Sequence, residues 1–443
     1  MKARLLLILA ISLPAAAQAP GERETVTIEE AVRLAVARYP DVAKARAAAE
    51  GLKGRIREVR AQALPDVRVT ANGNRFRDPS FLNSSGIDKF PPEFKDAIMP
   101  VAVNAFDYSI TFKQPLYTAG KVGTALRIAS IESEGAQLDV DRSQQDLALQ
   151  VVRAAYALLW AERSRTLVAE TREQRRLHAE MARARFANGV ATEVDVLRSE
   201  VALANLTPEL VRADNAIRQA RAQLNYYLVR PLDFATTIST GFQEKSWDQW
   251  DLEALAQQAL RSRPEVQRLR IAERSAESQI QLAKAESKMS ADFSSSYGLV
   301  ARFPKNLVDP LFARWSLGVS FTLPVFDGFR RSGLVTQATA NQRTVRLERE
   351  NVEQQVRLGL QQALDEMKAA SETVTAAQGT IAQAEKVLAM MQSNYRYGAA
   401  TTLDIVDAQT SLSEARTNLL RGMYDYSVAR ANLLWTAGRN PWE

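Results

Sequence analysis

The stretch Gly189–Val196, GVATEVDV, decides the fold, because it returns 209 residues later as Gly398–Ile405, GAATTLDI. In both copies a glycine interrupts a long helical pattern, and a threonine three residues later precedes another one. Glycine allows the tight turn that reverses a chain, and threonine is a common helix N-cap. The stretch therefore predicts a hairpin of two helices in each copy. The turn residues of the two hairpins are Gly189, Thr192, Gly398 and Thr401.

Other motifs repeat in the same order. Tyr39–Val42 returns as Arg263–Val266, and Gln114–Tyr117 returns 209 residues later as Leu323–Phe326. Order and spacing agree over most of the chain, which indicates that one unit is present twice. The predicted boundaries are a signal peptide at 1–19, a first repeat at 20–229, a linker at 230–249, a second repeat at 250–437 and a C-terminal tail at 438–443.

The first residues have the pattern of a secretory signal. Lys2 and Arg4 precede the apolar run Leu5–Leu13, and small residues up to Ala19 follow. A positive start, an apolar segment and small residues for cleavage are typical of a signal peptide. We therefore expect the chain to be exported.

The composition excludes several classes of site. The 443 residues include no cysteine and one histidine, which excludes disulfides, thiolate metal sites, cysteine lipid anchors and any site that needs two histidines. We expect no catalytic centre, no metal and no cofactor. The formal charge is +6, and no block of Lys and Arg stands out, so no nucleic-acid partner is expected.

Four segments alternate apolar and polar residues, as strands with one apolar and one polar face do. They lie at 66–71, 106–113, 292–299 and 315–323. A half-buried sheet in a soluble domain would give the same pattern. The signal peptide and the aromatic residues near the strand ends favour a membrane location.

Two stretches without proline, Lys121–Ala187 and Arg330–Tyr397, predict very long helices of roughly 100 Å each. In the second stretch large residues recur every seven positions, mostly with alanine three positions later. The large residues are Leu360, Met367, Val374, Ile381, Leu388 and Tyr395. This heptad pattern predicts helices that pack closely side by side.

No segment after the signal has 18 apolar residues without a charge, so a membrane-spanning helix is not expected. An exported chain would then cross a membrane only as a closed barrel. A barrel needs about eight strands or more, so several protomers would have to contribute strands. A secreted helical coiled-coil scaffold or adhesin is the alternative that periodicity leaves open.

Together these features resemble the TolC family of outer-membrane efflux channels. The matching residues are Gln114–Tyr117, Leu323–Gly328 and the hairpin Tyr395–Ala408, and the likeness covers nearly all of the chain after the signal. It implies a mainly α fold with a β-barrel portion, built from a duplicated strand, long helix, hairpin and helix. Three protomers would form one 12-stranded outer-membrane barrel and a long periplasmic α-helical barrel.

The resemblance implies a passive channel of a tripartite efflux system, located in the cell outer membrane and extending into the periplasm. The implied partners are further copies of the chain as a homotrimer, a periplasmic adaptor protein, an inner-membrane pump and outer-membrane lipid. A channel of a type I protein secretion system has the same architecture and is the second interpretation.

The resemblance also assigns residues at the hairpin of the second copy. Asp404 and Asp407 match two aspartates that narrow the periplasmic entrance, and their spacing places them on one helix face. Six carboxylates around one aperture of a trimer would attract cations, and their proximity should raise some of their pKa values. An aspartate at a helix start also stabilises the helix, and both roles can hold.

Tyr395 and Asp195 match residues that help to close the tip in this family. The arginine of that contact would stand where Ala400 is found. A contact between Tyr395 and Asp195 is therefore a hypothesis, and packing in the helix seam is the other interpretation of Tyr395. The strand-to-helix junctions are assigned to Pro115, Gly120, Pro324 and Gly328.

Two further residues stand out within the helical patterns. His178 lies in the arginine-rich segment 172–185 and is expected on a solvated helix face. Pro208 interrupts the last helical stretch of the first copy and predicts a kink there.

Overall fold

The computed structural model describes residues 24–78, 91, 102–242 and 250–443. The predicted signal peptide at 1–19 lies outside these residues. The described chain forms two compact units. The first contains the residues up to Ala43, Ser143–Ala259 and Val356–Glu443, and the second contains Lys44–Arg142 and Leu260–Gln355.

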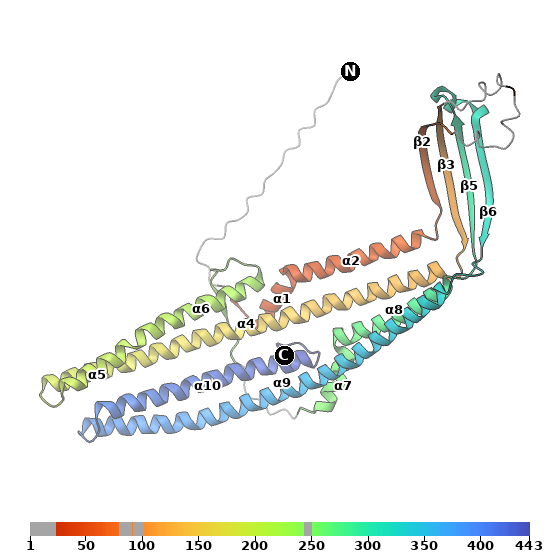
Figure 1. The fold of residues 1–443 in the computed structure, drawn as a ribbon. Coiled ribbons are helices and arrows are strands. Elements are labelled where there is room, and N and C mark those ends of the chain that lie inside the picture. Colours follow the sequence, from red (N-terminus) through yellow and green to blue (C-terminus); the bar gives the residue numbers. More distant parts are fainter. Residues whose placement is uncertain (1–23, 79–90, 92–101, 243–249) are drawn as a thin grey trace, which may run out of the picture. The chain divides into compact units, whose positions relative to one another are not determined.

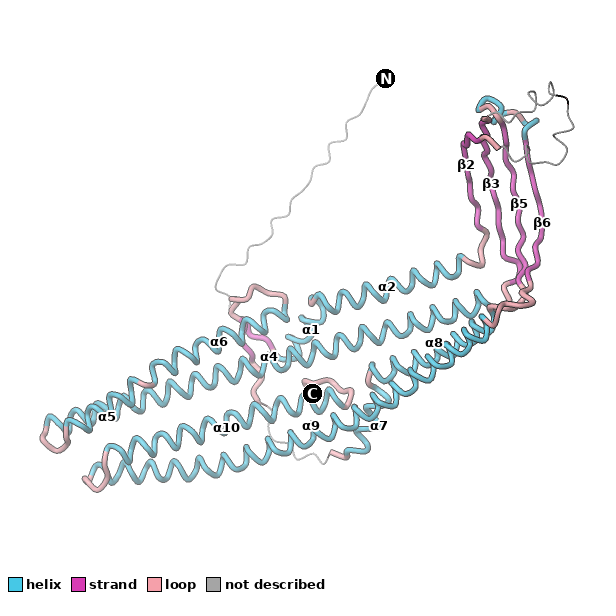
Figure 2. The backbone as a smooth tube through the Cα atoms, viewed as in Figure 1, coloured by secondary structure: helices cyan, strands magenta, loops and turns pink. Residues whose placement is uncertain are grey.

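The first unit consists mainly of two helical hairpins, which Figures 1 and 2 show as long paired helices. Their helices are α4 (Lys121–Ala187), α5 (Glu193–Ala204) and α6 (Leu206–Leu228) in the first copy, and α9 (Arg330–Arg396) and α10 (Thr402–Thr436) in the second. The first parts of α4 and α9, up to Arg142 and Gln355, belong to the second unit. The two predicted long helices are therefore confirmed, the second one residue shorter than expected. No helix among the described residues has both the length and the hydropathy to cross a membrane.

The heptad pattern of α9 corresponds to its buried side. Leu360, Met367, Val374, Leu388 and Tyr395 are all buried, as are most of the alanines three positions after them. Small residues at alternate seam positions let two helices approach closely. The seam predicted from the sequence is thus the surface on which this helix packs.

The first copy differs from the second in one respect. α5 ends at Ala204 and α6 begins at Leu206, whereas α10 continues without a break to Thr436. Pro208 falls in the first turn of α6, where a backbone N–H has no partner within the helix, so proline is tolerated. The interruption predicted from this proline is confirmed.

The first unit also holds a small parallel pair of strands, β1 (Glu24–Val26) and β4 (Thr236–Ile238). The short helices α1 (Ile28–Arg38) and α7 (Leu252–Ser262) stand near the start of the first and second copies. The core packed between β1, β4, α1 and the hairpins is apolar. Its largest fully buried side chains include Tyr156, Leu158, Leu224 and Leu228.

The second unit carries one antiparallel sheet of four strands in the order β2-β3-β5-β6. The strands are β2 (Asp66–Phe76), β3 (Val103–Tyr117), β5 (Ser290–Ala301) and β6 (Ala313–Thr322). The helix α2 (Pro40–Ala61) precedes β2, and α8 (Pro264–Ala285) precedes β5. Two short 3₁₀ turns, Pro304–Val308 and Pro310–Phe312, join β5 to β6. All four predicted strands are confirmed.

The strand register separates apolar from polar residues. One row across the sheet pairs Val69, Ile110, Tyr297 and Trp315. The next row pairs Arg68, Thr111, Ser296 and Ser316, and the hydroxyls of the last two lie 2.8 Å apart. Paired residues share a face and successive rows alternate between faces. The sheet therefore has one apolar and one polar face.

The chain changes from strand to helix at the same backbone feature in both copies. Ala119 and Gly120 have positive φ of 52° and 81°, and Gly328 and Phe329 have positive φ of 62° and 67°. Next to Pro115 the pairing of β3 with β5 shifts register. Two successive left-handed residues form each junction, and glycine takes the second place in one copy and the first in the other.

Candidate functional site at the hairpin turns

Both hairpins of the first unit reverse direction in the same way. Gly189 and Gly398 have φ of +73° and +78°, a region that glycine enters without steric cost. Thr192 and Thr401 cap the helices that follow, since each threonine hydroxyl accepts a hydrogen bond from the backbone N–H three residues on. The predicted turns and caps are present in both copies.

Asp195 and Asp404 complete these caps. The Asp404 carboxylate accepts hydrogen bonds from the Thr401 backbone N–H at 2.7 Å and from the Thr401 hydroxyl at 2.8 Å. These bonds lower the pKa of Asp404 below its ordinary value of 3.8. The Thr192 hydroxyl and backbone N–H lower the pKa of Asp195 in the same way. Within one chain the pKa of Asp404 is therefore lowered, whereas neighbouring carboxylates in a trimer were expected to raise it.

Asp404 and Asp407 are both exposed and lie three residues apart at the start of α10. One side of the helix therefore presents two carboxylates to solvent. Asp404 is engaged in the cap, as the alternative interpretation required. A ring around an aperture needs further copies of the chain, so the constriction stays a prediction.

Tyr395 and Asp195 are linked through a third residue. The Tyr395 hydroxyl lies 3.3 Å from the Thr402 hydroxyl, and the Thr402 hydroxyl donates a hydrogen bond to the Asp195 carboxylate. Tyr395 and Thr402 belong to the second hairpin, and Asp195 belongs to the first. Within one chain the two residues are therefore linked through Thr402, and a direct contact stays a hypothesis. Tyr395 is 4% exposed, so it is also the seam residue that the heptad predicted.

Arg185 forms a second connection between the hairpins. Its Nη1 donates a hydrogen bond of 2.8 Å to the Tyr395 carbonyl oxygen, and its guanidinium lies 4.5 Å from the centre of the Tyr395 ring. A cation over an aromatic face is attracted to it. The sequence interpretation missed this residue, and it noted only that Ala400 replaces the family arginine.

His178 is buried, at 4% exposure, and its ring centre lies 5.5 Å from that of Tyr395. The expectation of a solvated helix face was therefore wrong. His178 and Arg185 are seven residues apart, so a heptad drawn through α4 would have placed both on one buried side. The many arginines in this segment led to the assignment of His178 to a solvated face, because arginines are mostly exposed.

A groove of about 500 Å³ lies beside this contact, between α5 and α10. Its apolar lining includes Val194, Leu197 and Val201 from α5, each more than half exposed, and Leu403 and Val406 from α10. Arg175 and Arg198 also line it. The hairpin turns thus present an apolar surface with basic residues beside it.

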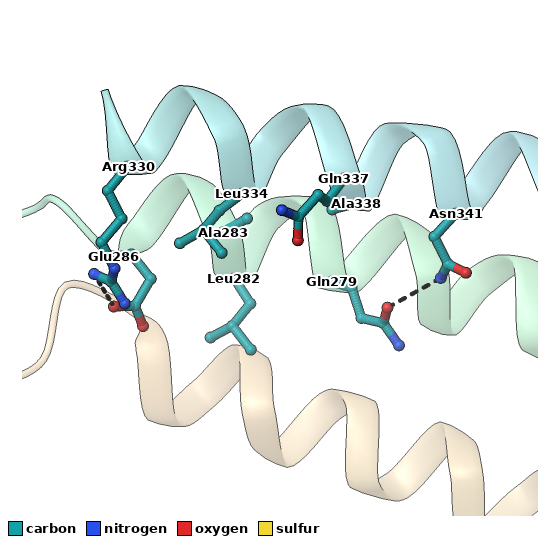
Figure 3. A pocket seen from close by; sticks show the side chains of 9 residues that line it. All are labelled: Gln279, Leu282, Ala283, Glu286, Arg330, Leu334, Gln337, Ala338 and Asn341. Carbon is teal, nitrogen blue, oxygen red and sulfur yellow. Dashed lines mark hydrogen bonds and ion pairs between the residues drawn. The ribbon is translucent and has the colours of Figure 1, made fainter. Parts of the chain in front are cut away.

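Another hollow lies in the second unit, between α8 and the first part of α9 (Figure 3). It is lined by amide, alanine and leucine side chains, and the Asn341 amide donates to Gln279 across it at 3.3 Å. At one end Arg330 pairs with Glu286 at 3.7 Å. This lining carries no nucleophile, and its one carboxylate, that of Glu286, is paired with Arg330. No group of three or more His, Asp or Glu side chains in the described ranges could hold a metal ion.

The model of one protein family, described as outer membrane efflux protein, matches residues 31–228 and 255–439. The chain belongs to this family. Family membership confirms the predicted location in the outer membrane, with an extension into the periplasm. It also excludes the alternative of a secreted scaffold or adhesin. The domain boundaries predicted from the duplication stay a prediction.

Individual relatives are distant in sequence. The chain is 22% identical to outer membrane protein TolC of Escherichia coli (strain K12) over 98% of this chain and 86% of that protein. It is 24% identical to alkaline protease secretion protein AprF of Pseudomonas aeruginosa over 67% of this chain and 62% of that protein. These relatives are named as outer-membrane and secretion proteins and not as enzymes, in agreement with the expected absence of catalysis.

The fold also resembles that of a solved structure. The outer membrane protein VceC from Vibrio cholerae matches with a TM-score of 0.75 and 19% identity over 93% of this chain and 96% of that chain. At this identity the match establishes the fold. The family match, and not the structural likeness, shows that the chain is an outer-membrane protein of the efflux and secretion class.

Proposed function

We propose that the chain is the outer-membrane channel of a tripartite efflux system and acts as a homotrimer. Each protomer contributes four strands to a 12-stranded barrel, and the long helices of the three protomers form a tunnel through the periplasm. A periplasmic adaptor and an inner-membrane pump deliver substrates to the tunnel, which conducts them passively to the exterior.

The observation that carries this proposal is the sheet of the second unit. Trp315, Leu317 and Phe321 on β6 are 65–73% exposed, and Val67 and Val69 on β2 are about as exposed. These residues belong to the apolar face, which would be costly in water and favourable against lipid. Among the described residues, β2 and β6 each pair on one side only, and the two free edges would be satisfied by the neighbouring protomers.

The apolar groove between α5 and α10 supports the proposed adaptor. Exposed apolar side chains at i, i+3 and i+7 on α5, namely Val194, Leu197 and Val201, match the spacing with which a partner helix packs. The groove lies beside the hairpin turns, where the adaptor is proposed to dock.

The pore function is proposed for Asp404 and Asp407. Their exposed carboxylates would form a ring of six charges in a trimer, because each protomer supplies two. Such a ring favours cations over anions at the entrance. The capping role of Asp404 is compatible with this function, since the cap uses one carboxylate oxygen, Oδ2.

The assembly is tested with two neighbouring substitutions on β6. Leu317→Arg places a charge on the apolar face, which is expected to cost about 2–4 kcal/mol in a bilayer and to abolish the heat-resistant trimer in the outer-membrane fraction. Ser316→Arg places the same charge on the polar face and is expected to leave the trimer intact. Equal tolerance of both substitutions would refute the assignment of the faces.

A type I protein secretion channel is the second candidate, favoured by the match to a protein named for alkaline protease secretion. Crosslinking in the native host distinguishes the two candidates. An efflux pump that co-purifies with the chain, together with increased sensitivity to toxic small molecules in a deletion strain, supports the first. A co-purifying transporter and the loss of one exported protein would support the second.

A further inference from the structure

His178 lies in the contact between the two hairpins of one protomer. It is the only histidine of the chain, it is 4% exposed, and its ring faces Tyr395 of the other hairpin at 5.5 Å between ring centres. Neither ring nitrogen has a hydrogen-bond partner among the described residues. Buried polar atoms are nearly always bonded, so such a site needs an explanation.

Tyr395 is the residue on which this contact converges. Arg185 donates to its carbonyl oxygen and covers one part of its ring, and Thr402 binds its hydroxyl. Thr402 in turn bonds Asp195 of the first hairpin. Any change that displaces the Tyr395 ring would therefore disturb its contacts with Arg185 and His178 of the first hairpin and its hydroxyl contact with Thr402.

The charged groups around this contact are mainly basic. On α4, Arg175 and Arg185 flank His178, and Arg175 donates to the Ala202 carbonyl oxygen of α5 at 3.2 Å and to the Thr410 hydroxyl of α10 at 3.0 Å. Among the acidic groups, Asp195 on α5 is bound to threonines and Glu209 on α6 acts on Arg175, while Glu173 and Glu180 on α4 pair with Arg176. α9 supplies Tyr395, and α10 supplies the buried Gln409.

No carboxylate among the described residues forms an ion pair with His178. An imidazolium ion at this position would be a buried cation near the half-buried Arg175 and Arg185, with no carboxylate bound to it among the described residues. A buried charge without a partner is strongly unfavourable. The neutral ring packs against Tyr395 without this cost.

We propose that His178 makes the contact between the two hairpins sensitive to pH, so that protonation of His178 loosens the tip and favours the open entrance. This inference rests on the proposed channel function, because only in a channel does a loosened tip become an opening. In the closed form the ring is buried and binds a proton poorly. In the open form the ring is in contact with water and binds a proton readily, so acidification favours the open form.

The direction of the pH dependence follows from linkage. Burial lowers the pKa of His178 below its ordinary value of 6.5. The contact is therefore fully stable above about pH 6.5, and it weakens as the pH falls through the lowered value. Each pKa unit of lowering makes the closed form about tenfold less favoured at low pH.

The first experiment measures the titration directly. Protein labelled with ¹³C-histidine and prepared without a polyhistidine tag gives one imidazole signal, because the chain has one histidine. The pKa read from this signal in the trimer is expected below 6.5. A value at or above 6.5 would overturn the proposal.

The second experiment measures the opening of the contact. Ala182, one turn from His178, is fully buried, and the chain has no cysteine of its own, so Ala182→Cys reports access of a thiol reagent. The measured quantity is the ratio of the labelling rate of Ala182→Cys to that of the exposed Ala184→Cys variant. When the pH is lowered from 7.5 to 5, this ratio is expected to rise about tenfold for each unit by which burial lowers the pKa of His178. With His178→Phe the ratio should stay constant, since phenylalanine keeps a ring against Tyr395 and cannot be protonated.

A ratio that rises equally with and without His178 would overturn the proposal. The labelling needs no channel activity, so its result is independent of the proposed function. Failure of the proposed function shows instead as the absence of a trimer or of conductance in planar bilayers. If the trimer conducts, the increase in conductance on acidification should follow the titration of His178 and be lost with His178→Phe.

Discussion

The two hairpin turns share a backbone and differ in what their side chains do. Both have a left-handed glycine, a threonine cap and an aspartate that completes the cap. In the second hairpin Tyr395 is 4% exposed, whereas its counterpart Phe186, 209 residues earlier, is 46% exposed. Asp407 corresponds in the same way to Arg198.

The difference indicates that the copies have taken separate roles around one contact. The first hairpin supplies Arg185 and His178, which contact the Tyr395 ring, and Asp195, which accepts a hydrogen bond from Thr402. The second supplies the ring itself and the pair of exposed carboxylates. Identical local hydrogen bonds form both turns, so the specialisation lies in the residues that point away from the turn.

The largest expected effect distinguishes the two aromatic residues. Tyr395→Ala removes a buried ring and its contacts with His178 and Arg185, and it should destabilise the helical part by about 3–5 kcal/mol. Phe186→Ala removes an exposed ring and should change stability by about 0.5 kcal/mol or less. Urea unfolding followed by far-ultraviolet circular dichroism measures both. Equal losses would show that the two turns are equivalent after all.

A smaller effect concerns the charges. Asp407→Arg gives the second turn the charge of the first, and it should abolish the cation preference of the channel, because three positive charges enter the proposed ring. Arg198→Asp is the matched control and should leave the preference nearly unchanged. Reversal potentials under a KCl gradient measure the selectivity. A larger change in the control would move the constriction to the first hairpin.

The smallest effect tests what the two turns share. Thr401→Ala and Thr192→Ala each remove a cap and should each cost about 1 kcal/mol. Thr380→Ala is the control, since the Thr380 hydroxyl bonds only the Ala376 carbonyl oxygen within α9. Thermal unfolding in the same detergent ranks the three variants. Clearly unequal costs of the two caps would mean that the contact around Tyr395, and not the cap alone, stabilises one of the turns.

The sequence predicted the local features of this site well. The alternation of β6 predicted a strand with one apolar face, and the lack of proline between Lys121 and Ala187 predicted one uninterrupted helix. The threonines after the turn glycines predicted caps, because cap hydrogen bonds span three residues and depend on little else. The positions of the two aspartates on one face of α10 followed from helical periodicity alone.

The contacts between the hairpins were harder to predict. His178 was assigned to solvent because its neighbours in the sequence are charged, and its burial depends on a helix that is more than 200 residues away in the chain. The role of Thr402 as the link between Tyr395 and Asp195 has no counterpart in the repeat, since the matching residue of the first copy is Glu193.

The sequence by itself determined the duplication, the lengths of the helices, the turns and the two faces of the sheet. These features depend on hydrogen bonds and side-chain periodicities that act over a few residues. Only the tertiary structure decided which side chains of the two hairpins meet, and hence that His178 is buried against Tyr395. Burial and pKa are set by neighbours in space, and a linear pattern does not contain them.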